Sequence, residues 1–174
     1  MGAAPTTNRL AELYAHPLSM VVDPARSPST ASPAEVLHTR RVVFPHDEYW
    51  VVHDHVRGRD RSNRYVARWH LRDESPGKVR VVRNSKHTTI ITPAGRIVVP
   101  TSVEVEVERD AVVVLRPVDG STDIVTVLSP GRAGVTMVDQ TRDGFLHCSI
   151  LRGSTTDLIR WGPDTDISWE RWSA

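Results

Sequence analysis

Apolar and polar residues alternate most regularly at 103–108, where valine and glutamate take turns along the chain. A repeat of two residues sends successive side chains to opposite faces of a strand, so this segment predicts a β-strand with one dry and one solvated face. The segments 111–115 and 124–128 are instead apolar at nearly every position. Such short apolar runs are typical of central strands that are covered above and below.

Glycine and proline divide the region 39–161 into short segments. Turns recur about every ten residues, which is the spacing that a sandwich or barrel of short antiparallel strands requires. Valine, whose branched side chain favours strands, occurs 25 times. We therefore expect about eleven strands and an all-β fold, an antiparallel β-sandwich. The expected turns are 45–47, 57–60, 75–77, 93–95, 119–120, 130–131, 143–144 and 162–163.

The first 37 residues lack this strand pattern. Residues 7–15 predict a short helix with Thr7 as its N-cap, and the Ser/Pro-rich stretch 24–33 predicts an irregular connector. At the other end, Trp169 and Trp172 indicate a tail that packs back on the sheet. We accordingly divide the chain into an irregular, partly helical N-terminal segment (1–37), a β-sandwich domain (38–163) and a C-terminal tail (164–174).

The chain is nearly neutral, with 22 basic and 21 acidic side chains and a net charge of +1. A molecule without a strong overall field is not expected to bind nucleic acid or an anionic membrane. The single cysteine excludes an internal disulfide framework. Residues 1–18 show no basic region followed by an apolar one, and no segment approaches the ~20 apolar residues that cross a bilayer. We therefore expect a cytoplasmic protein.

Two ionisable residues interrupt apolar strand segments near the start of the β region. Arg40 lies within 38–44 and Asp54 within 49–56. A buried charge without a partner is costly, so each of these side chains needs a counter-charge. We expect a structural ion pair between them, bidentate and hydrogen-bonded, that fixes the register of two neighbouring strands. The alternative, Asp54 as a general base, requires a cleft around it.

Three histidines are candidates for acid–base chemistry. His53 and His55 share one face of their strand, and His70 follows on a later strand. If the strands 49–56 and 64–72 pair as a hairpin, the three imidazoles converge on one patch. Histidine titrates near neutrality and suits proton transfer, while two strand histidines and a third from a neighbour also suit zinc. Our primary expectation is no metal or other cofactor, with zinc as the alternative and ordinary surface histidines as the third reading.

Arginines gather around the predicted tip of that hairpin. Their forked guanidinium groups match carboxylates and sulfates, and Trp50 and Trp69 are placed to stack on sugar rings. An alternative reading is a solvated, charged turn that prevents association of sheet edges. The candidate substrate-binding arginines are Arg57, Arg59, Arg61, Arg64 and Arg68, with Arg72 beside them.

Five motifs occur in order between His38 and about Gly162. They are His38-x-Arg40-Arg41-x-Val43-Phe44; Tyr49-Trp50-Val51-Val52-x-Asp54-x-Val56-x-Gly58; Trp69-His70-Leu71; Val125-Thr126-Val127-Leu128-x-Pro130; and Ile150-x-Arg152-Gly153 with Asp157-Leu158-Ile159. This ordered set resembles the C-terminal β-sandwich of the heparinase II/III-like polysaccharide lyases. The resemblance implies a β-sandwich and an association with β-elimination of polysaccharides.

Lyases of that family resemble a two-part machine, in which an α/α-toroid supplies the catalytic Tyr and His and the sandwich closes the cleft. No toroid segment is recognisable in this chain. The family's metal pattern, a His-x-His followed by Asp-x-Gly and His-Asn, is not reproduced before His38, and Asp54 matches an aspartate of a later family strand. The resemblance therefore assigns no catalytic and no zinc residue here.

Two function hypotheses from different classes follow. In the first, a stand-alone sandwich binds an anionic polysaccharide through the arginines, or supports a polysaccharide lyase activity that a separate catalytic subunit supplies. In the second, the chain is a small-molecule lyase, cyclase or dehydratase with His53, His55 and His70 as its catalytic groups, in a pocket within the sandwich. A purely structural protein that forms a homo-oligomer is the third reading.

Overall fold

The computed structural model describes residues 20–23, 37–57, 64–71, 78–108, 112–117, 123–131, 134–142, 145–162 and 167–173. Every strand pairing among these residues is antiparallel, so the expected all-β antiparallel class is confirmed. The elements are β1 (Met20–Asp23), β2 (Leu37–Val43), the 3-10 turn η1 (Pro45–Asp47), β3 (Trp50–Arg57), β4 (Arg64–His70), β5 (Arg80–Arg83), β6 (His87–Ile91), β7 (Gly95–Pro100), β8 (Val103–Val107), β9 (Val112–Pro117), β10 (Asp123–Pro130), β11 (Thr136–Arg142), β12 (Phe145–Arg152), β13 (Thr155–Trp161) and β14 (Ile167–Ser173).

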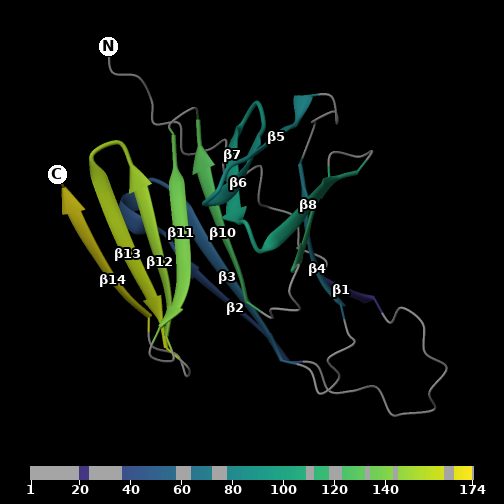
Figure 1. Ribbon diagram of the computed structural model, residues 1–174, viewed down its shortest axis with the longest axis horizontal. Helices are drawn as coiled ribbons and strands as arrows, with labels where there is room; N and C mark the ends of the chain where they lie inside the picture. The colour runs from purple at the N-terminus through teal and green to yellow at the C-terminus, as the bar shows by residue number, and fades with distance from the viewer. Residues whose placement is uncertain are drawn as a thin grey trace.

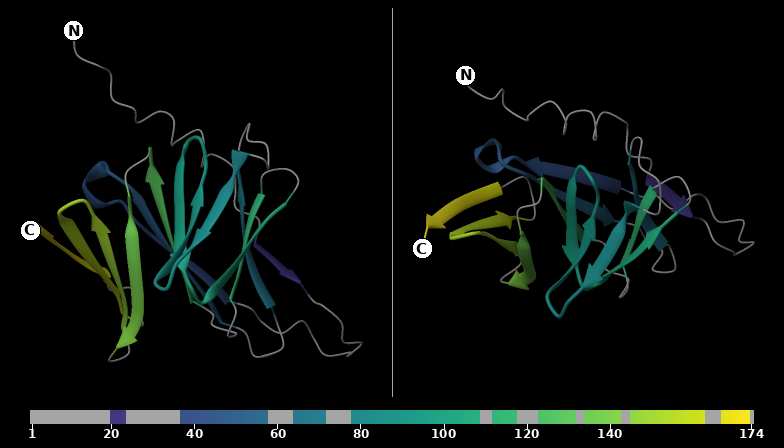
Figure 2. Two further views of the ribbon diagram at one scale, coloured as in Figure 1. Left: turned by 45° about the horizontal axis from the view of Figure 1, so that its top comes forward. Right: turned by 90° about the horizontal axis from the view of Figure 1, so that it is seen from above.

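The strands form three sheets. The first sheet has the order β1-β4-β9-β8, the central sheet β2-β3-β10-β7-β6-β5, and the third sheet β11-β12-β13-β14. Figure 1 shows the first and third sheets on opposite sides of the central sheet, and Figure 2 shows the same arrangement from two further directions. The central sheet is therefore the shared middle layer of the molecule.

Two hydrophobic cores fill the spaces on either side of the central sheet. Val52 of β3 and Ile97 of β7 meet Trp69 of the first sheet in one core. Their chain neighbours Val51 and Val98 enter the other core, against the third sheet. Because the side chains of a strand alternate, β3, β7 and β10 of the middle layer each supply both cores. The expected sandwich is present, and it has three layers.

The alternating segment 103–108 and the apolar run 124–128 form the kinds of strand that their periodicity predicts. In β8, an edge strand, Val103 and Val105 are buried while Glu104 and Glu106 are exposed, which confirms the one-sided strand. In β10, every residue of 124–129 is buried, because this strand runs through the middle of the central sheet with a core on each face. Periodicity therefore distinguishes an edge strand from a central strand in this chain.

The predicted strand 111–115 corresponds to β9, which pairs with β4 and β8 inside the first sheet. Val113 and Leu115 are buried in the first core. Most of the opposite face of β9 lies outside the described side chains, so its coverage on both faces stays a prediction.

The predicted hairpin of 49–56 and 64–72 is wrong. β3 pairs with β2 and β10 in the central sheet, whereas β4 pairs with β1 and β9 in the first sheet. The two strands face each other across a core, where Val52 and Trp69 belong to the same cluster. The apolar faces of β3 and β4 are buried whether the strands pair in one sheet or face each other from two stacked sheets. The local sequence therefore does not distinguish a hairpin from a stacked arrangement.

Strands also form near both ends of the chain. The predicted C-terminal tail contains β14, which pairs with β13, so this part of it packs on the sheet as expected. β1 pairs with β4 within the region expected to be irregular. The predicted helix 7–15 lies outside the described residues, and the division into 1–37, 38–163 and 164–174 stays a prediction. In the described part of the chain, we find no helix with the length and apolar character that crossing a membrane demands.

Gly95 opens β7 at a predicted turn, and its backbone lies tightly against β10. A Cβ at this position would overlap the carbonyl oxygen of Ser129 and lie 3.2 Å from the Cα of Pro130. Both obstacles are backbone atoms, so neither can rotate away. We expect Gly95→Ala to lower the free energy of unfolding by about 1–3 kcal/mol, measured by urea denaturation. Gly134→Ala is the matched control, because a Cβ at Gly134 meets no atom within 4 Å; equal effects of the two changes would contradict the close approach.

Candidate functional site

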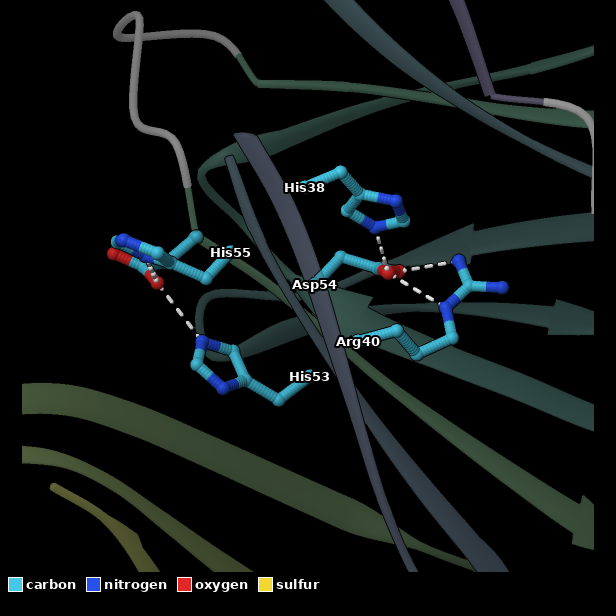
Figure 3. A network of polar contacts seen from close by, with 6 residues as sticks. His38, Arg40, His53, Asp54 and His55 are labelled. Carbon is cyan, nitrogen blue, oxygen red and sulfur yellow. Dashed lines mark hydrogen bonds and ion pairs between the residues drawn. The ribbon is translucent and has the colours of Figure 1, made fainter. Parts of the chain in front are cut away.

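β3 carries a group of polar side chains on each of its faces. Asp54 points to the first core together with Val52, while His53 and His55 point to the opposite side. Figure 3 shows the two groups on opposite sides of the strands, with His38 and Arg40 around Asp54 and the other two histidines well apart from them. Alternation along one strand therefore separates two polar networks that are adjacent in sequence.

The predicted contact between Arg40 and Asp54 is present. The two residues are direct partners in the antiparallel register of β2 and β3. Arg40 Nε donates to Asp54 Oδ1 at 2.6 Å and Arg40 Nη2 donates to Oδ2 at 2.8 Å, a bidentate pair. The pair has a third member that the sequence did not indicate: His38 Nε2 lies 2.8 Å from the same Oδ1. Asp54 is 1% exposed, and both of its carboxylate oxygens accept hydrogen bonds from the Arg40 guanidinium, so the carboxylate is suited to a structural role.

The tryptophans near this pair are part of the packing. Trp69 is 4% exposed and lies in the first core, with the Arg40 guanidinium 5.7 Å from its ring centroid. Trp50 is half-buried and stacks on Phe44, with a centroid distance of 4.1 Å. The expectation that Trp69 stacks on a ligand is wrong, because the apolar face of β4 turns toward the core and takes the ring with it.

The other face of β3 carries a cluster of two histidines and Asp123, which comes from β10. Asp123 is the register partner of His55. Its Oδ1 lies 2.8 Å from His53 Nε2 and 2.7 Å from His55 Nδ1. Among the described residues, these three potential ligand atoms all lie within 4.8 Å of one another. Asp123 and His55 remain partly exposed, with 38% and 29% of their side-chain surfaces open to solvent, while His53 is buried.

A carboxylate only accepts hydrogen bonds, so each nitrogen that contacts Asp123 carries a proton in this arrangement. Burial alone would raise the pKa of Asp123, but the hydrogen bonds from His53 and His55 outweigh it and hold the pKa below its ordinary value. Nε2 of His55 is the ring nitrogen that does not contact Asp123, and the ring is partly exposed. The Nδ1 of His53 is buried and has no hydrogen-bond partner among the described atoms.

The predicted convergence of three histidines does not occur. His70 is exposed on β4, where it pairs with Val112 in the first sheet, whereas His53 and His55 lie on the side of the central sheet that faces the third sheet. The hairpin on which the convergence depended does not form. The third member of the cluster is instead Asp123, 68 residues after His55 in sequence, and no local pattern in the sequence indicates that β10 pairs with β3.

The predicted arginine patch lies mostly outside the described residues. Arg59, Arg61 and Arg72 belong to segments that the structure does not describe, and the side chains of Arg57 and Arg64 are not described either. Arg68 is described: its Nη2 lies 3.9 Å from Glu108 Oε1, and the side chain is partly exposed. The substrate-binding role of these arginines therefore stays a prediction.

A second concentration of basic residues, which no sequence pattern had indicated, lies along the β5 edge of the central sheet. Residues 78–102 contain no Asp or Glu. All four residues of β5 are exposed, and β5 is the last strand of its sheet. Arg83 Nη2 donates to the carbonyl of Val105 at 3.3 Å, and no ion pair joins the other basic side chains to an acidic group within the described residues. We call the following set the β5 basic edge: Lys78, Arg80, Arg83 and Lys86 along β5 and its flanks, together with Arg96 on β7, two strands further into the sheet.

A buried polar network ties the third sheet to the start of β3. The Asp157 carboxylate of β13 accepts hydrogen bonds from Tyr49 Oη, from Arg171 Nε at 2.6 Å and from Arg171 Nη2 at 2.8 Å. Glu48 Oε2 in turn lies 3.0 Å from Arg171 Nη2 and 2.8 Å from Arg152 Nη1. The network joins residues that are more than 100 positions apart, and so it fixes the position of the third sheet.

Charge and burial determine the protonation states in this network. Burial would raise the pKa of Asp157, but the hydrogen bonds from Arg171 and Tyr49 outweigh it and lower the pKa. Burial and the contact with Asp157 raise the pKa of Tyr49, and the hydrogen bond to Asp157 raises that of Arg171. Asp157 is therefore an anion at neutral pH, Tyr49 a neutral donor and Arg171 a cation.

The fold, with a polar network on each face of β3, defines the class of protein as an antiparallel β-sandwich module. A family model described as Heparinase II/III-like, C-terminal, matches residues 25–145. The match covers more than half of the 174 residues, so the chain belongs to the heparinase II/III-like C-terminal family. Neither the search of the curated proteins nor the search of the solved structures found a match.

Proposed function

We propose that this chain binds an anionic polysaccharide and supports a β-elimination carried out by a separate catalytic subunit. Its membership in the heparinase II/III-like C-terminal family supports the association with polysaccharide lyases. The observation that carries the binding proposal is the β5 basic edge. It concentrates positive charge on one edge of a chain whose net charge is only +1.

The β5 basic edge has the properties that a linear polyanion requires. Arg80 and Lys86 are exposed, and neither forms an ion pair among the described residues. A guanidinium group offers a fork of donors that matches a carboxylate or a sulfate, while an ammonium group acts as a point charge. Since a strand rises about 3.3 Å per residue, charges along β5 and its flanks are spread over more than about 10 Å. Arg80 and Arg83 point to opposite faces of this edge strand, so a chain of charged sugars would run along the strand edge and meet charges from both faces.

We expect the protein to be retained on a heparin or alginate matrix at low salt and released as salt rises. The variant Arg80→Gln/Lys86→Gln should elute at clearly lower salt, because it loses two charges of the β5 basic edge. Arg59→Ala/Arg61→Ala tests the arginine segment in the same way. The measurement is the salt concentration at elution from the charged matrix, with neutral dextran as the control matrix.

The matched control variant is Arg116→Gln/Arg160→Gln. It also removes two positive charges, but both arginines form surface ion pairs elsewhere, with Glu106 and Glu170. Its elution should stay close to that of the unaltered protein. No retention of the unaltered protein at low salt would overturn the proposal, and an equal shift in the control variant would show that only total charge matters.

One observation favours the second candidate function, a small-molecule lyase, cyclase or dehydratase. His55 is oriented by Asp123 at 2.7 Å and presents its second ring nitrogen as a base. His70 lies on β4 in the first sheet, apart from His55, and has no role in this second function. A β-elimination creates a conjugated double bond, so ultraviolet absorbance with short acidic saccharides as substrates tests it. Turnover by the chain alone that disappears in His55→Ala supports this function; no turnover with any acidic saccharide favours the binding function.

A further inference from the structure

We propose that His53, His55 and Asp123 form a binding site for one transition-metal dication, with zinc as the best match. The site is independent of the polysaccharide proposal, because none of its ligands belongs to the β5 basic edge. The geometry points to it: two imidazole nitrogens and one carboxylate oxygen converge within 4.8 Å of one another. Two paired strands, β3 and β10, hold them on the same face of one sheet.

The donor set selects the class of metal. Two nitrogens and one oxygen suit zinc and its neighbours in the first transition row, whereas magnesium and calcium prefer oxygen ligands throughout. Three protein ligands leave a fourth tetrahedral position open for water or a ligand. Because Asp123 and His55 are partly exposed, an incoming ion and its water can reach this position.

Small side-chain movements bring the ligand atoms to coordination distance. Zinc lies about 2.0–2.2 Å from nitrogen and oxygen ligands. His53 is fixed, since it is buried and its ring lies 5.1 Å from that of Trp161. His55 and Asp123 can adjust about their side-chain bonds on the open side. The two nitrogens that now donate to Asp123 would give their lone pairs to the metal, with each ring proton carried on the other nitrogen.

The surroundings predict moderate affinity. When His53 Nε2 binds a metal, its Nδ1 carries the proton, and that buried atom has no hydrogen-bond acceptor among the described residues. A missing partner of this kind typically weakens metal binding by about 10–100-fold. Arg41 lies opposite His53 in the register of β2 and β3, but a guanidinium group only donates hydrogen bonds, as its Nη1 does to the Gly162 carbonyl at 2.9 Å, so it cannot accept this proton. We therefore expect zinc to bind more weakly here than at a site whose ligating histidines all have hydrogen-bond acceptors.

The test is calorimetric titration of Zn²⁺ into the full chain, without an affinity tag and after treatment with a chelator. We expect one zinc per chain, and a tetrahedral visible spectrum when Co²⁺ replaces zinc. His55→Ala and Asp123→Asn should each weaken zinc binding at least tenfold. Both side chains are partly exposed, so these variants are expected to fold, which circular dichroism verifies.

His70→Ala is the matched control, because His70 is an exposed strand histidine outside the cluster; its zinc affinity should be unchanged. The proposal is overturned if the unaltered chain binds no zinc, or if His55→Ala and Asp123→Asn bind it as well as the unaltered chain does. A loss in His70→Ala equal to that in His55→Ala would also overturn it. Retention on heparin is measured separately, so either proposal can fail alone.

Discussion

Replacing Arg40 by methionine should lower the free energy of unfolding by about 3 kcal/mol. The change removes the bidentate partner of Asp54, whose carboxylate is 1% exposed and retains only the contact with His38. A buried carboxylate that loses its counter-charge cannot recover the loss from water. Methionine keeps most of the volume of the arginine stem, so the effect reports the charge. Urea unfolding followed by tryptophan fluorescence measures it.

A double-mutant cycle separates the interaction energy of Arg40 with Asp54 from the effects of the two single changes. Arg40→Met/Asp54→Leu removes both charges together, and the double variant should be clearly more stable than Arg40→Met alone, because no buried charge remains unpaired. His38 loses its partner in this variant, but it is exposed and can turn to water. A cost below about 1 kcal/mol for Arg40→Met, or simple additivity in the cycle, would contradict a buried ion pair that holds β2 against β3.

Asp157→Asn should lower the free energy of unfolding by about 3 kcal/mol at neutral pH. Asp157 is 1% exposed and is the common partner of Tyr49 and Arg171. Its loss weakens the contact between the third sheet and the start of β3. The matched control is Glu170→Gln, which removes an exposed carboxylate that pairs with Arg160 on the surface of the same sheet. The control should change stability by no more than about 0.5 kcal/mol.

The same variant predicts a pH dependence. Because the pKa of Asp157 is lower in the folded protein, its contribution to stability is complete above the pKa of an unfolded aspartate, about 3.9. The contribution is lost as the pH falls through the lower folded pKa. The stability difference between the unaltered protein and Asp157→Asn should therefore shrink as the pH falls below about 4. Parallel stability curves from about pH 7 to about pH 3 would contradict the assignment.

The sequence predicts the parts of the fold that depend on local alternation. The valines of 103–107 and the apolar run 124–128 occupy the kinds of strand that their periods indicate. The pair of Arg40 and Asp54 is predictable for a related reason: two charges in neighbouring apolar strands have few other partners. Each of these inferences uses residues on one strand or on two consecutive strands.

Contacts between distant strands are not predictable in the same way. Asp123 joins His53 and His55 because β10 pairs with β3, a register that nothing near residue 123 specifies. β4 faces β3 across a core, although the two strands follow each other in the chain as a hairpin would. The β5 basic edge was missed because Val81 and Val82 make the segment look like an ordinary strand, and its position at the end of a sheet is set by the other strands.

Salt dependence of binding tests the proposed function most directly. The measurement is the equilibrium dissociation constant for labelled heparin across a series of salt concentrations. If the β5 basic edge binds the polyanion, the affinity should fall steadily with salt, and Arg80→Gln/Lys86→Gln should reduce the logarithmic slope by about one for each basic side chain that no longer neutralises an anionic group. An affinity that does not change with salt, or an unchanged slope in this variant, would contradict binding of an anionic polysaccharide at β5.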